Sequence, residues 1–222
     1  MSIIIAVDGT AASGKGTLAK RLARHFNFAH MDSGALYRLT ALAVLEQHGD
    51  PTNADDAMKG AQTIDLARAG DPAIRSDKVG QTASLVAAIP AVRRSLHDFQ
   101  RSFLDHPPGH SLGAVMDGRD IGTVIAPGAT AKLFIDAEPE VRAHRRRLEL
   151  QSLGIERDEA ELLAEIVARD YADRTRAVSP LKRASDASLL DTSALGIDAA
   201  FAAALALVKP KVDSALKASH RG

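Results

Sequence analysis

The chain has 222 residues, and its 28 Lys and Arg residues are matched by 28 Asp and Glu residues. The formal net charge is therefore zero, so no global field favours nucleic acid or an anionic membrane as a partner. The chain has no cysteine, which excludes disulfides, thiolate metal sites and cysteine nucleophiles.

Short apolar runs alternate with helical patterns along the first half of the chain. Residues 3–7 form a β-branched run that predicts a buried strand and is too short for a signal or membrane segment. A helix follows at 15–26, where Leu18, Leu22 and Phe26 recur at i, i+4 and i+8. A second helix begins near Ser33 and ends before 49–51, and 53–69 is moderately helical. We expect a soluble, cytoplasmic protein.

The second half repeats this alternation. Ser76 and Asp77 are expected to cap a helix that ends at Ile89, and Pro90 opens another. That helix carries a predicted core stripe of Val92, Leu96, Phe99 and Phe103. Residues 106–110 read as a loop rather than a metal site, although His106 and His110 flank it. Strands are predicted at 112–116, 131–135 and 188–190, helices over 138–174 and 198–208, and an exposed basic tail at 209–221.

Strands that alternate with helices predict an α/β fold with a mainly parallel sheet flanked by helices. We expect a single domain over 1–222. Its core is assigned to about 1–58, 90–137 and 175–222, with a short insert at about 59–89 and a helical lid at about 138–174.

A phosphate-binding motif lies between the first predicted strand and the first helix. The spacing G-x-x-x-x-G-K predicts a P-loop whose main-chain N–H groups and helix N-terminus bind phosphate, with Lys15 on the β- and γ-phosphates. Gly16 stands where the strict motif has Ser or Thr, so a Mg²⁺ contact is expected from Thr17, directly or through water. The predicted ATP-binding residues are Gly9, Thr10, Ala11, Ala12, Ser13, Gly14, Lys15, Gly16 and Thr17.

Further segments narrow the class of P-loop protein. A guanine-reading N-K-x-D motif is absent, which argues against a GTPase. The ending Gly-Lys-Gly-Thr resembles nucleoside monophosphate kinases. Together with the segments at 31–38, 83–93, 117–124 and 169–181, it resembles the bacterial-type cytidylate kinases over about residues 5–190.

The resemblance implies how the acceptor nucleotide is read. Asp120 would face cytosine together with Arg93 and Ser84. The chemistry agrees, because a carboxylate accepts from the N4 amino group of cytosine and a guanidinium donates to N3 or O2, whereas uracil reverses the N4 and N3 roles. By the same resemblance, Ser33, Arg38, Arg119 and Arg176 would surround the acceptor phosphate, and Arg169 and Asp173 would hold the ribose hydroxyls.

The resemblance also implies a mobile lid over 138–154. Arg142, Arg145 and Arg146 are related by i+3 and i+4, so one helical face could present them to ATP, and a solvated charged helix is the equal alternative. The insert is shorter than in many relatives. We assign transition-state charge stabilisation to Lys15, Arg119, Arg145 and Arg176.

The implied reaction is direct in-line transfer from ATP, with Mg²⁺, to CMP or dCMP by a monomer. No general base is evident; Asp32 lies near the acceptor side but is at least as well explained as a helix N-cap. Tyr37 is expected either to stack on a base or to pack in the core. Two alternatives stay open: a nucleotide sensor without catalysis, and a kinase for another acceptor such as UMP or a non-nucleotide alcohol.

Overall fold

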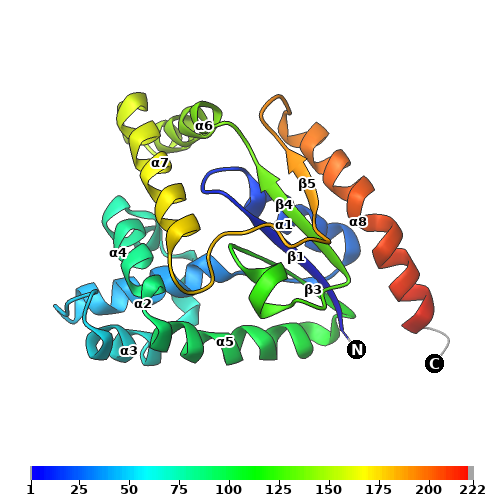
Figure 1. The fold of residues 1–222 in the computed structure, drawn as a ribbon, viewed down its shortest axis with the longest axis horizontal. Coiled ribbons are helices and arrows are strands. Elements are labelled where there is room, and N and C mark those ends of the chain that lie inside the picture. Colours follow the sequence, from blue (N-terminus) through cyan, green and yellow to red (C-terminus); the bar gives the residue numbers. More distant parts are fainter. Residues whose placement is uncertain (1, 220–222) are drawn as a thin grey trace.

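Five parallel strands form one sheet in the computed structural model, which describes residues 2–219 (Figure 1). The strand order is β2-β3-β1-β4-β5, so β1 lies at the centre and carries the phosphate-binding loop at its carboxyl end. This confirms the predicted α/β class. The strands are β1 (Ile3–Gly9), β2 (Ala29–Asp32), β3 (Gly113–Gly118), β4 (Ala131–Asp136) and β5 (Ser188–Asp191).

Helices cover both faces of the sheet and extend beyond one of its sides (Figure 1). Short 3₁₀ turns lie at 66–70, 72–75 and 108–110, and a π-helical turn at Ile121–Ile125. Within residues 2–219, no helix has both the length and the apolar character that crossing a bilayer requires. The helices are α1 (Lys15–Phe26), α2 (Ser33–Glu46), α3 (Ala54–Gln62), α4 (Asp77–Ala88), α5 (Pro90–Asp105), α6 (Pro139–Ser152), α7 (Glu159–Thr175) and α8 (Ile197–Ser219).

Alternate side chains of β1 enter two different apolar clusters. Ile3, Ile5 and Val7 pack with α1 and α8 on one face of the sheet. Ile4 and Ala6 pack on the other face with α5 and the turn 121–125. Because both faces of β1 are buried, the strand reads as a continuous apolar run. A third cluster joins α2, α3, α4 and the first turns of α5 beside the sheet, and a fourth joins α6 to α7.

Several predicted elements differ in extent. Strand β2 was not predicted, because its four half-buried residues do not form an apolar run. The helical segment expected at 53–69 ends at Gln62 and gives way to a 3₁₀ turn. The helices expected over 138–174 are α6 and α7, which are separated near Gly154, a residue with a positive φ of 76°.

One prediction about side-chain exposure was wrong. On α5, Val92 and Leu96 are buried as expected, but Phe99 is 37% exposed, because the polar Gln100 occupies the buried face and donates to the Leu96 carbonyl. The basic tail is helical to Ser219, and its described lysines are exposed as expected, whereas Val212 is fully buried against the sheet cluster; Arg221 lies outside the described residues.

Candidate active site

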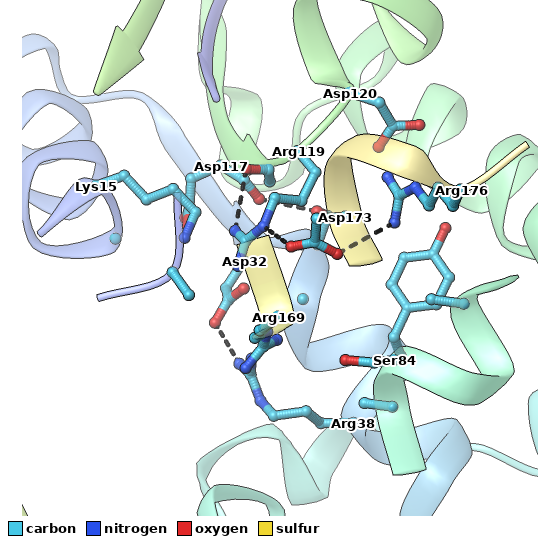
Figure 2. Close-up of a pocket in the computed structure, with 18 of the residues that line it drawn as sticks. Lys15, Asp32, Arg38, Ser84, Asp117, Arg119, Asp120, Arg169, Asp173 and Arg176 are labelled. Carbon is cyan, nitrogen blue, oxygen red and sulfur yellow. Dashed lines mark hydrogen bonds and ion pairs between the residues drawn. The ribbon is translucent and has the colours of Figure 1, made fainter. Parts of the chain in front are cut away.

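One cavity of about 250 Å³ lies where the phosphate-binding loop, α2, α4, β3 and α7 meet. Figure 2 shows Lys15 at one end of it and Asp120 with Arg176 at the other, with Arg119 and Asp173 between them. The cavity lining contains every residue that the sequence analysis assigned to the acceptor nucleotide: Ser33, Arg38, Ser84, Arg93, Arg119, Asp120, Arg169, Asp173 and Arg176. Residues separated by more than 140 positions in the chain thus share one site.

The loop at the end of β1 adopts backbone conformations that its small residues permit. Gly9 has a φ of 155°, and a Cβ there would lie 2.0 Å from the carbonyl oxygen of Ile135 on β4. Gly14 precedes α1 in a left-handed conformation with a φ of 85°. Ala11, Ala12, Lys15 and Gly16 line the cavity, so the N-terminus of α1 and its unpaired N–H groups open onto it.

The surroundings of Lys15 disfavour the protonated form of its side chain. Desolvation, and then the nearby charge of Arg119, lower the pKa of Lys15 to about 7, while Asp117 and Asp32 act in the opposite direction. Its ammonium group lies 3.5 Å from the carbonyl oxygen of Thr10. A bound anion at this position would restore the ordinary charge of the lysine.

The far end of the cavity holds a buried ion pair. Arg93 on α5 donates to Asp120, which follows β3, and each of these two residues is less than 8% exposed. Arg93 also donates to the carbonyl oxygen of Ala87 at 3.2 Å and lies 5.4 Å from the ring centroid of Tyr37. Tyr37 both lines the cavity and packs against the α2–α4 cluster, so the structure accommodates both of its predicted roles.

Arginine side chains and one carboxylate form the middle of the cavity. Arg119 donates to Asp173 at 2.7 Å, and Arg176 lies 3.7 Å from the other oxygen of the same carboxylate (Figure 2). Burial disfavours the charged form of Asp173, but Arg119 and the neighbouring arginines hold its pKa below the ordinary value. One carboxylate therefore holds two guanidinium groups in place.

Arg38 on α2 and Arg169 on α7 add further positive charge to the cavity lining. Arg38 pairs with Asp32 at 2.6 Å, and Asp32 also accepts from the N–H of Ala35 as the N-cap of α2, which favours the capping interpretation of this aspartate. Desolvation, and then repulsion by Arg119, lower the pKa of Arg169 to about 10. Within residues 2–219, its buried Nε atom has no hydrogen-bond partner. Such unpaired buried donors favour an anionic ligand.

The lid arginines do not share one face, contrary to the expectation from their spacing. Arg142 is 2% exposed and donates to the carbonyl oxygen of Ala11 and to Asp170. Arg145, predicted to be catalytic, donates to Thr192 and to the carbonyl oxygen of Leu195 and does not line the cavity. Arg146 turns towards Asp77 at 3.5 Å. Each long side chain reaches a different partner, so helical spacing alone was misleading.

Thr17 is likewise not brought to the cavity. It is exposed in the first turn of α1, about 100° around the helix from its neighbour Gly16. Gly16 does line the cavity, and a Cβ placed on it would lie 3.5 Å from Oδ2 of Asp117. The position of the hydroxyl in the strict motif is therefore occupied by a residue without a side chain, and the metal contact expected from Thr17 stays a prediction.

Asp117 is a cavity residue that the sequence analysis did not single out. It is the penultimate residue of β3, next to the strand that carries the phosphate-binding loop, and is 3% exposed. His30 on β2 lies 2.9 Å from its Oδ1 atom. The available signal was an acidic residue at the carboxyl end of an apolar strand.

The chain is similar to known proteins over most of its length. A sequence profile of the family described as cytidylate kinase matches residues 5–210. The cytidylate kinase of Rhodopseudomonas palustris (strain TIE-1) is 53% identical over 207 residues, which cover 93% of this chain and 96% of that protein. The cytidylate kinase of Nitrobacter winogradskyi is 51% identical with the same coverage. Among solved structures, an uncharacterized protein from Eubacterium ventriosum has a TM-score of 0.52 at 14% identity, covering 94% of this chain and 99% of that one, which is a likeness in fold alone.

Proposed function

This chain belongs to the cytidylate kinase family, and we propose that it transfers the γ-phosphoryl group of ATP directly to CMP or dCMP, giving CDP or dCDP and ADP. One observation carries the proposal: a single cavity joins a phosphate-binding loop to a second set of arginines that ends at a buried Arg–Asp pair. A protein that only sensed ATP would not need this second anion site.

The two ends of the cavity suit two nucleotides held head to head. ATP would place its phosphates on the loop and Lys15. The acceptor phosphate would lie among Ser33, Arg38, Arg119 and Arg176, and the planar guanidinium groups of these arginines bind phosphate oxygens in pairs. Arg169 and Asp173 would hold the ribose hydroxyls. The reacting oxygen and phosphorus atoms would then meet in the middle of the cavity, aligned by binding alone.

The buried pair at the far end suits cytosine. With Arg93 held against it, Asp120 remains an acceptor for the N4 amino group, and the guanidinium keeps N–H donors for N3 or O2. Uracil at this position would leave buried polar groups unpaired. Sites that read hydrogen bonds in this way discriminate by up to ~10⁴-fold. Ser84 and Tyr37 complete the wall around the base.

Mg²⁺ fits the chemistry of the Lys15 end. Asp32 and Asp117 both line that part of the cavity, and one or two carboxylates together with substrate phosphates are the usual ligands of this ion. When bound, Mg²⁺ neutralises charge on the β- and γ-phosphates. We propose that Asp117, rather than the exposed Thr17, holds it, because a Cβ placed on Gly16 in the first turn of α1 would lie 3.5 Å from Oδ2 of Asp117.

The protein contributes electrostatic stabilisation to the transfer rather than covalent chemistry. Lys15, Arg119 and Arg176 would stabilise the charge that spreads over the equatorial oxygens in the transition state. We further propose that the insert 59–89 and the lid 138–174 close over both nucleotides, which excludes water as a competing acceptor. Arg146 lies in this lid, and its positive charge contributes to lowering the pKa of Arg169. We therefore expect Arg146 to move with the lid when it closes.

A coupled assay with ATP, Mg²⁺ and each common nucleoside monophosphate tests the function. We expect rapid ADP formation with CMP and dCMP, slower formation with UMP and little with purine monophosphates. Identification of CDP as the product separates transfer to CMP from ATP hydrolysis. Tight ATP binding without CDP formation would instead support the sensor alternative and contradict the proposal.

A further inference from the structure

Asp8 is a buried carboxylate to which the proposed mechanism assigns no part. It lies on β1 directly before the first glycine of the phosphate-binding loop and is 4% exposed. Its Oδ1 accepts from the N–H of Ile121 at 2.8 Å, and its Oδ2 accepts from the N–H of Gly122 at 2.7 Å. Both oxygens are therefore used to hold the main chain of another segment.

That segment directly follows the residues that face the acceptor nucleotide. Arg119 and Asp120 lie between the end of β3 and the turn Ile121–Ile125. The two N–H groups that donate to Asp8 belong to the first two residues of that turn. A carboxylate on such N–H groups fixes the turn as an N-cap fixes a helix. The position of Asp120 relative to the phosphate-binding loop thus depends on this contact.

The residue at position 122 is fitted to the same contact. A Cβ placed on Gly122 would lie 3.2 Å from Oδ2 of Asp8 and 3.2 Å from Cδ of Lys132, closer than ordinary side-chain contacts. Burial raises the pKa of Asp8 to about 6, and the two N–H groups act against that rise. At neutral pH the carboxylate is therefore ionised and accepts both hydrogen bonds.

We infer that Asp8 is a positioning residue for acceptor recognition, which fixes Arg119 and Asp120 relative to the strand that carries the phosphate-binding loop. This inference rests on the proposed function, because it assigns Asp8 to the reading of cytosine in that reaction. It makes base selectivity depend on a side chain that does not line the cavity.

The test is Asp8→Asn, which keeps the shape of the side chain but turns an NH₂ group towards one of the two main-chain donors. We expect kcat/KM for CMP to fall roughly 10- to 100-fold, because a buried donor loses its acceptor. The CMP/UMP ratio of kcat/KM should fall with it, while KM for ATP changes by less than about threefold. A purely structural role would lower the melting temperature without changing that ratio.

Asp191→Asn is the matched control, since Asp191 also accepts from a main-chain N–H at a strand end, but that N–H belongs to Ser193, which is remote from the cavity lining. It should leave the CMP/UMP ratio unchanged. Gly122→Ala disturbs the same contact at its main-chain partner, so the CMP/UMP ratio should shift in the same direction by a smaller factor. If Asp8→Asn does not fold, the ratio of Gly122→Ala is the test.

The outcomes separate the two claims. An active wild-type enzyme whose CMP/UMP ratio survives Asp8→Asn, or survives Gly122→Ala where the first variant does not fold, would overturn this inference alone. A wild-type protein that forms no CDP would overturn the proposed function and the inference with it.

Discussion

The two ends of the cavity are built in different ways. At the donor end, one short contiguous loop presents main-chain N–H groups and a single lysine. At the acceptor end, side chains from α2, α4, α5, the segment after β3 and α7 meet, and buried ion pairs fix them. Phosphate binding at the donor end is therefore encoded in one local segment, whereas recognition of a base requires side chains that only the tertiary structure brings together. Substitutions at the two ends should therefore have different effects.

The largest expected effect is that of Lys15→Ala at the donor end. Removing the cation takes away charge stabilisation in the transition state, and we expect kcat to fall by roughly 10²-fold or more while the fold is kept. Steady-state kinetics together with circular dichroism measure both. Turnover close to that of the wild type would remove Lys15 from the proposed mechanism.

Asp120→Asn addresses the acceptor end. The amide can no longer offer two acceptor oxygens to Arg93 and cytosine, so we expect the CMP/UMP ratio of kcat/KM to fall by about 10-fold or more, with KM for ATP little changed. Competition between the two monophosphates in one reaction measures the ratio directly. An unchanged ratio would place base recognition elsewhere.

Asp173→Ala tests the shared carboxylate in the middle of the cavity. Because Asp173 is proposed to hold the ribose hydroxyls as well as Arg119, the loss in kcat/KM should be larger for CMP than for dCMP, by several-fold. Parallel kinetics with the two substrates give the comparison. Equal losses would limit Asp173 to orienting the arginine.

Proton uptake on ATP binding tests the lowered pKa of Lys15. Its pKa of about 7 leaves most of the ligand-free lysine neutral at pH 8, and bound phosphates should raise that pKa again. ATP binding should then take up most of one proton at pH 8 and almost none at pH 6. Calorimetry in buffers of different ionisation enthalpy detects this uptake. Lys15→Met is the control and should abolish it; a buffer-independent enthalpy of ATP binding to the wild type at pH 8 would contradict the assignment.

The smallest effect is expected from Arg145→Ala. Arg145 donates to Thr192 and Leu195 outside the cavity, so kcat should change by less than about threefold. The lost hydrogen bonds should lower the free energy of unfolding by about 1 kcal/mol. Denaturant unfolding and kinetics on the same sample separate the two quantities. A 10²-fold loss of kcat would show that the lid rearranges to bring this arginine to ATP.

The sequence predicted the donor end better than the details of the acceptor end and the lid. Residues 3–26 show the patterns of a strand, a glycine-rich loop and a helix in succession, so local sequence rules are enough to predict the structure of this region. The acceptor residues followed only from the resemblance to a family, since no local rule joins Arg93 to Asp120 or Arg119 to Asp173. Strand β2 was missed, because its four half-buried residues acquire their extended form by pairing with β3.

The length of the arginine side chain explains why the lid arginines do not share one face. Spacing of i+3 and i+4 places the Cα atoms of Arg142, Arg145 and Arg146 near one another, but each guanidinium group finds its own partner. Asp117 and Asp8 were overlooked for a related reason. Their roles depend on which strands lie side by side in the sheet, and no single segment of the sequence predicts the order of the strands.

Equilibrium binding tests the division of the cavity most directly. Calorimetric titration of CMP, and separately of ATP, into the wild type, Asp120→Asn and Lys15→Met gives six dissociation constants. We predict that Asp120→Asn weakens CMP binding and spares ATP, and that Lys15→Met weakens ATP binding and spares CMP. Variants that weaken both ligands alike would contradict a cavity with one end for each nucleotide.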